Sequence, residues 1–481
     1  MHTSRTTAAV AVAGLIASTA LLSAAPSQAD VAPQEKDVVA TGSDILQSAY
    51  NFLADGYGAL PGYNTAGNRW RFINLDSSGD AQGRTAYIDP RLVAKSGYLS
   101  NGNLITQAQY DALSSADKAA AKPLVKQEDV KQLNPAVALR AGQPLVVRPS
   151  GGGGGGRDAI INDYVDGNGI GNWIDVGRSP DPVDSAASGQ TNQTKAQTQL
   201  GTKLYSVVFG RDRQVIATAA TTNAPTSISA DDIKKIYRGQ ITTWGQVTGY
   251  DGPAPSETII PLTLPSDAGM WNTFLSGIQT ATGSSTTEFS NTNARSNPNS
   301  YNVQQNDPTA ISGITDESIR KNAIVPFPKS RATVVNGGYY TVAADGDDQT
   351  NPYNGAKTYT GSSASPSGTP ATRGNHRLAA TASGIKLLAP ASTGTLSTDP
   401  YGTNFALRAI FRESDLNSNV PWQPGSTLNW VRTLFYNPPT ADEPDPALPF
   451  VRTPAGKALI ESAGQTPSYQ VFGTNNAEIT Q

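Results

Sequence analysis

The hydrophobic positions of this chain form short apolar runs that alternate with stretches of helical spacing. Residues 38–40 make one such run, and after the turn Gly-Ser-Asp at 42–44 the apolar residues recur three and four positions apart over 45–53. This spacing predicts a strand, a tight turn and a helix. Either Ser43 or Asp44 is expected to cap the exposed N–H groups where the helix begins.

The same order of strand, turn and helix recurs twice more. The strand-like PLVVRP (144–149) precedes six glycines at 151–156 and a helical pattern over 157–165, and TIIPLTLPSDAGMWNTFLSGI (258–278) has its turn SDAG at 266–269. Because short strands alternate with helices, the pattern predicts an α/β fold. Further strands are expected in RWRFINLDSSG (69–79), NWIDVGRSPDP (172–182), LYSVVFGRDRQVIATAA (204–220) and NAIVPF (322–327), and long polar loops over 279–303 and 345–375.

The clearest helix begins in SADDIKKIYRGQITTWGQV (229–247). Ser229 and Asp232 form an acidic variant of the capping box, and an apolar stripe follows over 233–237. Gly239 ends the helix in this interpretation, since glycine adopts the left-handed conformation of a helix C-terminus without strain.

The composition narrows the possible functions. The chain has 481 residues, of which 37% are hydrophobic and 16% charged, enough for one large two-lobed domain. The formal net charge of −3 argues against nucleic acid as a partner. There is no cysteine, which excludes disulfides, thiolate metal sites and cysteine nucleophiles. With His376 as the only histidine beyond the N-terminal segment, neither a metal nor a cofactor is expected.

The N-terminal segment has the pattern of a secretory signal peptide over residues 1–29. A weakly basic start with Arg5 is followed by an apolar, alanine-rich stretch over 8–25 and by Ser-Gln-Ala at 27–29, which resembles a cleavage site. We therefore expect a secreted protein, periplasmic in a cell with two membranes. It should not be membrane-anchored, and without a cysteine it cannot be a lipoprotein.

The three turns at 42–44, 151–156 and 266–269 are candidates for one ligand site. In open α/β sheets, ligands bind beyond the carboxyl ends of the strands. A helix N-terminus favours anions, and glycine lets the backbone approach a ligand closely. Convergence of the three turns would make an oxyanion site without a metal. The alternative for the glycine run alone is a flexible linker.

These motifs resemble those of the phosphate-binding proteins of ABC transporters, in the type II periplasmic binding protein-like superfamily. SADDIKKIYRGQITTWGQV is the most specific match, and GSDILQ, RPSGGGGGGRDAI, NWIDVGRSPDP and LPSDAGMWNTF resemble ligand turns of that family. The similarity covers most of residues 37–335. It implies mixed β-sheets flanked by helices in two lobes, with hinge crossings near 205–217 and 322–332. Lobe one would contain 30–205 and 331–481, and lobe two 206–330.

The resemblance also implies a set of ligand-binding residues in the cleft between the lobes. They are Ser43, Asp44, Ser150, Gly153, Gly154, Gly155, Arg157, Arg178, Ser179, Asp181, Ser266, Asp267 and Gly269. The chain departs from the family where Pro265 replaces an arginine and where glycines replace a serine near Ser150. Arg157 or Arg178 would then supply the positive charge. Trp271 would either stack on a ring-shaped ligand or pack in the core of lobe two.

Three functions remain open. The first is a secreted, monomeric solute-binding protein for phosphate or a related oxyanion, with an ABC transporter permease as candidate partner. The second is a related binding module whose phosphate site has decayed and which binds another ligand, a cell-wall component or a protein. A phosphatase-like hydrolase is the weakest, because the sequence shows no nucleophile paired with a base and no metal cluster. We therefore expect no enzymatic activity.

Overall fold

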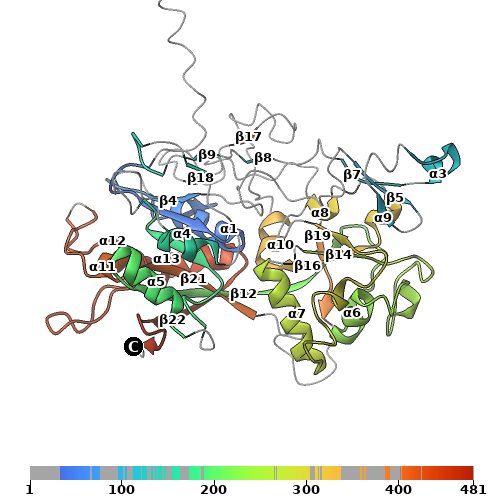
Figure 1. The fold of residues 1–481 in the computed structure, drawn as a ribbon. Helices are drawn as coiled ribbons and strands as arrows, with labels where there is room; N and C mark the ends of the chain where they lie inside the picture. Colours follow the sequence, from blue (N-terminus) through green and yellow to red (C-terminus); the bar gives the residue numbers. More distant parts are fainter. Residues whose placement is uncertain are drawn as a thin grey trace, which may run out of the picture.

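The structure is a computed structural model, and it describes most of the chain from residue 33 onward. The described residues are 33–64, 68–75, 96–100, 103–105, 112–120, 122–126, 132–133, 136–137, 139–143, 146–147, 154–162, 173–185, 189–264, 266, 268–303, 309–312, 314, 317–336, 358–359, 362–363, 385–390, 401, 404–423 and 425–479. The fold is mixed α/β with two lobes, as the sequence predicted (Figure 1).

The sheet of lobe one has a parallel centre. β1 (Val38–Gly42) lies between β4 (Phe72–Leu75) and β11 (Val176–Ser179) and runs parallel to both. β21 (Asn404–Arg412) pairs antiparallel with β11, so the chain returns to this sheet after leaving lobe two. The outer strands are β18 (Ser362–Ser363), β22 (Thr466–Phe472) and β23 (Glu478–Ile479).

Helices cover both faces of this sheet, because side chains alternate along each strand. Val38 and Ala40 pack in the main core with the 3-10 turn Asp44–Leu46, whereas Val39 belongs to a second cluster that contains Ile160. The first face carries α1 (Gln47–Asp55) and α13 (Pro454–Ser462), and the second carries α4 (Gly155–Ile161) and α5 (Thr191–Leu200).

One long strand, β12 (Leu204–Ala219), joins the lobes. Its first part pairs with β21 in lobe one, as far as Arg213. Its last part pairs with β16 (Ala323–Pro328) in lobe two, beginning at Gln214. The backbone therefore changes lobes within a continuous strand, which lies between the two halves of the molecule in Figure 1.

Lobe two is built on β16 and on β14 (Ile260–Thr263), which runs parallel to it. β19 (Ile385–Leu387) pairs with the lobe-two end of β12, although lobe one was expected to take up the chain again at 331. The other elements of this lobe are β13 (Ser227–Ile228), β15 (Tyr301–Asn302), β20 (Ala389–Pro390), α6 (Ala230–Tyr237), α7 (Gly269–Thr282), α8 (Thr309–Ser312), α9 (Glu317–Arg320) and α10 (Lys329–Asn336).

Short elements complete the described chain. They are β2 (Gly56–Tyr57), β3 (Leu60–Pro61), β5 (Ser96–Ser100), β6 (Asn103–Ile105), β7 (Lys122–Lys126), β8 (Gln132–Leu133), β9 (Ala136–Val137), β10 (Val146–Val147), β17 (Thr358–Tyr359), α3 (Ser115–Ala120), α11 (Glu413–Leu416) and α12 (Trp430–Leu434). The loop expected over 279–303 begins only after α7 and includes β15.

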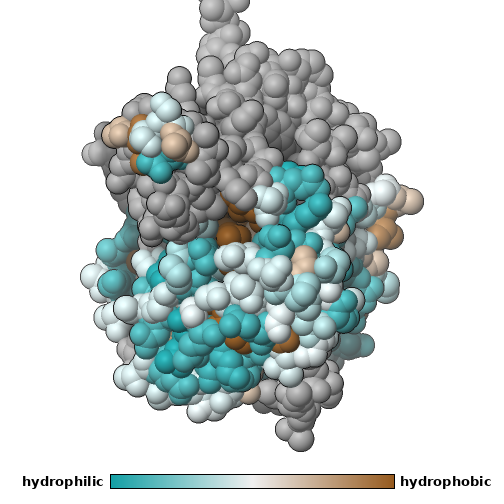
Figure 2. All heavy atoms as spheres, turned by 90° about the vertical axis from the view of Figure 1, so that its right-hand side faces the viewer, coloured by the Kyte–Doolittle hydropathy of each residue, from teal (hydrophilic) through white to brown (hydrophobic). Residues whose placement is uncertain are grey.

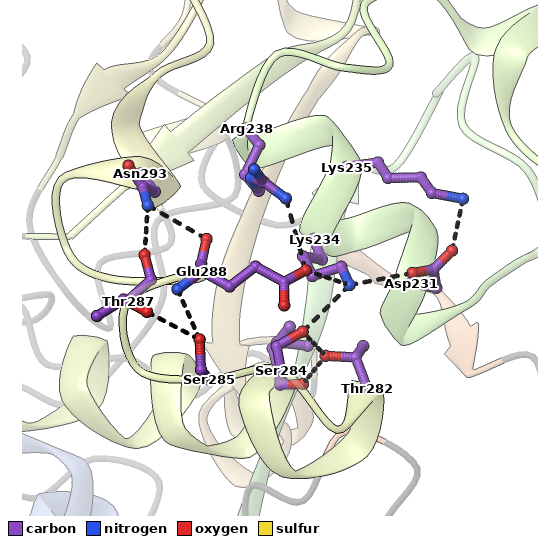
Figure 3. Close-up of polar contacts among 11 residues, drawn as sticks. Asp231, Lys234, Lys235, Arg238, Thr282, Ser284, Ser285, Thr287, Glu288 and Asn293 are labelled. Carbon is purple, nitrogen blue, oxygen red and sulfur yellow. Dashed lines mark hydrogen bonds and ion pairs between the residues drawn. The ribbon is translucent and has the colours of Figure 1, made fainter.

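Helix α6 begins as predicted, since the hydroxyl of Ser229 accepts a hydrogen bond from the backbone N–H of Asp232. Tertiary contacts add an ion cluster on this helix (Figure 3). The Nζ of Lys234 lies 3.2 Å from Oε1 of Glu288 and 3.1 Å from the hydroxyl of Ser284, which ties α6 to the segment after α7. The described surface on the lobe-two side is largely hydrophilic (Figure 2).

A buried carboxyl group lies where β12 changes lobes. Oδ1 of Asp212 accepts hydrogen bonds from the backbone N–H groups of Arg213 and Ser330, and Oδ2 accepts one from the Ser330 hydroxyl. Ser330 is the second residue of α10, which follows β16 directly, so Asp212 links the two segments that pass between the lobes. Burial raises the pKa of Asp212 from 3.8 to about 6, against the opposing effect of these hydrogen bonds and of the charge on Lys329.

We predict that Asp212→Asn stabilises the protein at pH 7.5. Because the pKa is higher in the folded state than in the unfolded state, this group stabilises the fold most below about pH 4, and its contribution is lost as the pH rises through about 6. A shift of this size corresponds to about 3 kcal/mol. In asparagine, the amide oxygen still accepts from the two backbone N–H groups, and the amide nitrogen donates to the hydroxyl oxygen of Ser330.

Urea unfolding from pH 4 to 8 measures the effect. The advantage of the asparagine variant should grow from near zero at pH 4 to about 1–3 kcal/mol at pH 7.5. Asp442→Asn, at an exposed position, is the control. A variant whose stability relative to the wild type does not change with pH would show that Asp212 is not the titrating group.

Candidate functional site

Two of the predicted turns meet through their backbones in lobe one. Gly42 has φ +118°, and a Cβ atom there would lie 2.4 Å from the Cα of Gly156. A Cβ on Gly156 would lie 2.3 Å from the carbonyl oxygen of Arg178. Side chains do not fit at these distances, so glycine is required where the start of α4 crosses the ends of β1 and β11. The glycine run is therefore no slack linker in its described part, 154–156.

Arg178 lies inside this junction, with none of its surface exposed. Its guanidinium donates to the carbonyl oxygens of Leu75, at 2.8 Å, and Gly42, at 2.7 Å, and to Oδ1 of Asn74. These acceptors stand at the carboxyl ends of β4 and β1. Arg178 thus holds strand ends together, and the direct ligand contact inferred from the sequence stays a prediction.

The turn after β1 brings two more predicted residues to this place. The backbone N–H of Ser43 donates to the carbonyl oxygen of Arg178, at 3.1 Å, so the turn is fixed against β11. Ser43 occupies the N-cap position of a 3-10 helix, but its hydroxyl makes no capping bond, contrary to the sequence interpretation. Asp44 is the first residue of that 3-10 helix and is buried.

The turn after β11 is held by two arginines. The hydroxyl of Ser179 binds the backbone of Asp181, accepting from its N–H at 3.0 Å and donating to its carbonyl oxygen at 2.9 Å. Nη1 of Arg157 donates to the carbonyl oxygen of Val183, at 3.4 Å, and Nη1 of Arg408 donates to that of Pro180, at 2.8 Å. Asp181 therefore lies between the two points at which these arginines bind the turn.

The carboxylate of Asp181 is the acidic group of this cluster. It has no hydrogen-bond donor among the described residues, and the residue is exposed to solvent. Desolvation by the surrounding protein raises its pKa, while the positive charges of Arg157 and Arg408 oppose the rise. These charges are thus close enough to act on any anion that reaches Asp181.

Glycine also decides where Arg157 lies. A Cβ on Gly154 would be 2.7 Å from Nη2 of Arg157, so the guanidinium folds back over the glycine turn. Nε of Arg157 binds Asp158 at 2.9 Å, and Nη2 has no hydrogen-bond partner in the part of the chain that is described. Helix α4 begins at Gly155, two residues before the expected start at 157.

The third turn belongs to lobe two. Ser266 is exposed, and Gly269 begins α7. Nothing in the sequence pointed to Arg295, which donates to the carbonyl oxygen of Leu264 and, at 2.7 Å, to the hydroxyl of Thr263. It stabilises the end of β14, just before the turn that contains Ser266. No described hydrogen bond joins Ser266 or Gly269 to the lobe-one cluster.

Trp271 packs in the core of lobe two. It is fully buried, its ring contacts Phe274, and its Nε1 donates to Asn291 at 2.7 Å. The interpretation of Trp271 as a stacking surface for a ring-shaped ligand is therefore wrong, because helix α7 turns this side chain inward.

Several sequence predictions fall outside the described residues. They concern Ser150, Gly153, Asp267, His376 and the signal peptide at 1–29. Among the described residues, no group of three acidic or histidine side chains could hold a metal ion. The helices described are all too short or too polar to cross a bilayer.

Comparison with known proteins identifies the family. A family model described as PBP superfamily domain matches residues 97–374, more than half of the chain. The chain belongs to the PBP superfamily. This confirms the resemblance inferred from the motifs at the level of the superfamily. No curated protein matches the sequence.

Solved structures with a similar fold are distant from this PBP superfamily member. One is named a putative phosphate ABC transporter substrate-binding protein from Clostridium perfringens and was solved with bound phosphate. It is 11% identical, and the match covers 65% of this chain and 83% of that protein, with a TM-score of 0.33. An ABC-type phosphate transport receptor from Vibrio cholerae is 12% identical over 66% and 86%, with a TM-score of 0.32. The periplasmic phosphate-binding protein PfluDING is 14% identical over 78% and 80%, with a TM-score of 0.34.

We predict that Gly156→Ala disrupts the junction. The added methyl group would meet the backbone of Arg178, which cannot move without shifting β11, so the free energy of unfolding should fall by about 2–3 kcal/mol. Urea unfolding measures this change. Gly473→Ala is the control, because the nearest atom to its Cβ would be at 3.4 Å. Equal stability of the two variants would contradict the close packing described here.

Proposed function

We propose that the protein is a secreted solute-binding protein that captures phosphate or a related oxyanion between its two lobes. The fold and the family favour solute binding. The observation that carries the choice of ligand is the turn at 179–183. There Arg157 leaves Nη2 without a partner in the described part of the chain, and the carboxylate of Asp181 accepts no hydrogen bond from the described residues.

This combination suits a partly protonated oxyanion. A guanidinium binds ionised oxygens by charge-assisted hydrogen bonds. An ionised carboxylate can only accept, so Asp181 requires a hydroxyl on the ligand. Monohydrogen phosphate carries both kinds of oxygen, whereas sulfate at neutral pH carries no proton. The site should therefore prefer phosphate over sulfate.

Supporting positions come from the same junction. The hydroxyl of Ser43 has no hydrogen-bond partner among the described residues, and the backbone N–H of Ser43 binds the carbonyl oxygen of Arg178 at the end of β11. Gly154 and Gly155 open α4 next to it. In lobe two, the turn that contains Ser266 and Gly269 is the candidate for the opposite side of the ligand.

The remaining assignments follow from this function. We propose that residues 1–29 direct export, that the mature protein is a monomer without a membrane anchor, and that a transporter permease is its partner. β12 and the segment from β16 to α10 would form the hinge, because both pass between the lobes at Asp212 and Ser330.

We predict that the purified protein binds inorganic phosphate and that Arg157→Ala weakens binding at least about tenfold, since a hydrogen bond to a charged group contributes about 1.5–3 kcal/mol. Calorimetry and tryptophan fluorescence follow titrations with phosphate, sulfate and a panel of sugars. Arg320→Ala, on α9, is the matched control, since Arg320 also donates to one carbonyl oxygen, that of Ile314 at 2.9 Å.

The titrations separate the possible functions. Absence of binding by any oxyanion at millimolar concentration would refute the proposal, and binding of a sugar instead would favour a module whose phosphate site has decayed. Turnover of a phosphomonoester by the purified protein, lost in Arg157→Ala, would point to a hydrolase.

A further inference from the structure

Arg408 reaches the candidate site from a segment that no motif marked. It lies on β21 directly opposite Ser179 of β11, in the antiparallel register of these two strands. Its Nη1 donates to the carbonyl oxygen of Pro180, at 2.8 Å, one residue before Asp181, whereas Arg157 binds that of Val183, two residues after it. More than 200 residues of sequence separate these two arginines, and only the sheet brings them to one turn.

Most of the hydrogen-bonding capacity of Arg408 is unused by the described protein. A guanidinium offers five N–H groups. Nε is buried without a partner, and among the described residues no acceptor binds Nη2, which therefore reaches solvent. The guanidinium lies 5.6 Å from the ring centroid of Phe472, which covers one side of it.

The charge of Arg408 is also incompletely balanced. Burial lowers its pKa to about 10, so it stays ionised at neutral pH. The negative charge of Asp181 raises the pKa of Arg408, but the nearby positive charge of Arg211 lowers it together with burial. No carboxylate of the described residues forms a salt bridge with Arg408. A partly desolvated cation without an ion-pair partner is unfavourable, and an incoming anion would relieve this cost.

We propose that Arg408 is a further ligand-binding residue, the second guanidinium of the oxyanion site, which faces the ligand across the turn from Arg157. This inference rests on the proposed function. The ligand would contact Nη2 of both arginines and would donate its hydroxyl to Asp181. A role confined to holding the turn needs only the single bond to Pro180 and leaves the remaining donors unexplained.

The test compares Arg408→Gln, Arg408→Lys and Arg238→Gln by calorimetric titration of the purified protein with inorganic phosphate. Arg408→Gln should weaken binding at least about tenfold. The affinity of Arg408→Lys should lie between those of Arg408→Gln and the wild type, because lysine keeps the positive charge but lacks the planar set of N–H donors of a guanidinium. Arg238 is the matched control: it lies in the lobe-two ion cluster, 3.6 Å from Glu288, and its loss should leave binding unchanged (Figure 3).

A pH profile separates a role in the site from a structural role. The groups whose charges act on Asp181 are Arg157, Arg408 and Asp158. Removal of the Arg408 charge raises the pKa of Asp181 further, so the acid limb of the affinity profile should move to higher pH in Arg408→Gln. A loss of packing alone would lower the melting temperature without moving that limb.

The outcomes distinguish the two proposals. Suppose that the wild type binds phosphate and that folded Arg408→Gln binds it with an affinity within twofold. If the acid limb of its affinity profile also stays at the same pH, the role of Arg408 is refuted while the proposed function stands. If Arg408→Gln does not fold, the test rests on Arg408→Lys. Phosphate affinity equal to that of the wild type in this variant would overturn the proposal that the guanidinium of Arg408 binds the ligand. A wild type that binds no oxyanion overturns both proposals.

Discussion

The contact of Gly42 with Gly156 and with the backbone of Arg178 is the constraint on which the rest of the site depends. It places the start of α4 on the ends of β1 and β11 at distances that exclude any side chain. Arg157 owes its position to this contact, because it follows Gly156 directly. The turn from Ser179 to Val183 leaves β11 beside it. A backbone junction therefore fixes the positions from which the charged side chains extend.

Buried charges are stabilised differently at the junction and at Asp212, where β12 passes between the lobes. The two terminal nitrogens of Arg178 donate to strand-end carbonyl oxygens and to an amide oxygen, which lets a cation stay inside the lobe. Asp212 is satisfied by N–H and hydroxyl donors, yet its pKa remains raised, because hydrogen bonds to neutral donors only partly offset desolvation. The first arrangement joins the ends of two strands within one lobe. The second joins the two segments through which the lobes are connected.

The candidate site is electrostatically mixed, which suits its proposed ligand. Arg157 and Arg408 both supply positive charge near Asp181, whose carboxylate would repel a fully ionised anion. Attraction by the arginines and selection by the carboxylate are separate contributions, and they come from different elements. An arginine from β21 can take part because β21 is the neighbour of β11 in the sheet.

Local pattern and local chemistry determined a large part of this protein. Apolar runs and helical spacing predicted β1, β11, β12, β14 and α6, and the cap at Ser229 followed from a hydrogen bond between residues three apart. Turn motifs identified the family and most of the lobe-one cluster. Only the tertiary structure decided the burial of Arg178, the inward packing of Trp271 and the arrival of Arg295 and Arg408. These outcomes depend on which strands pair and on which face a helix packs, and such long-range choices leave no periodic signal in the sequence.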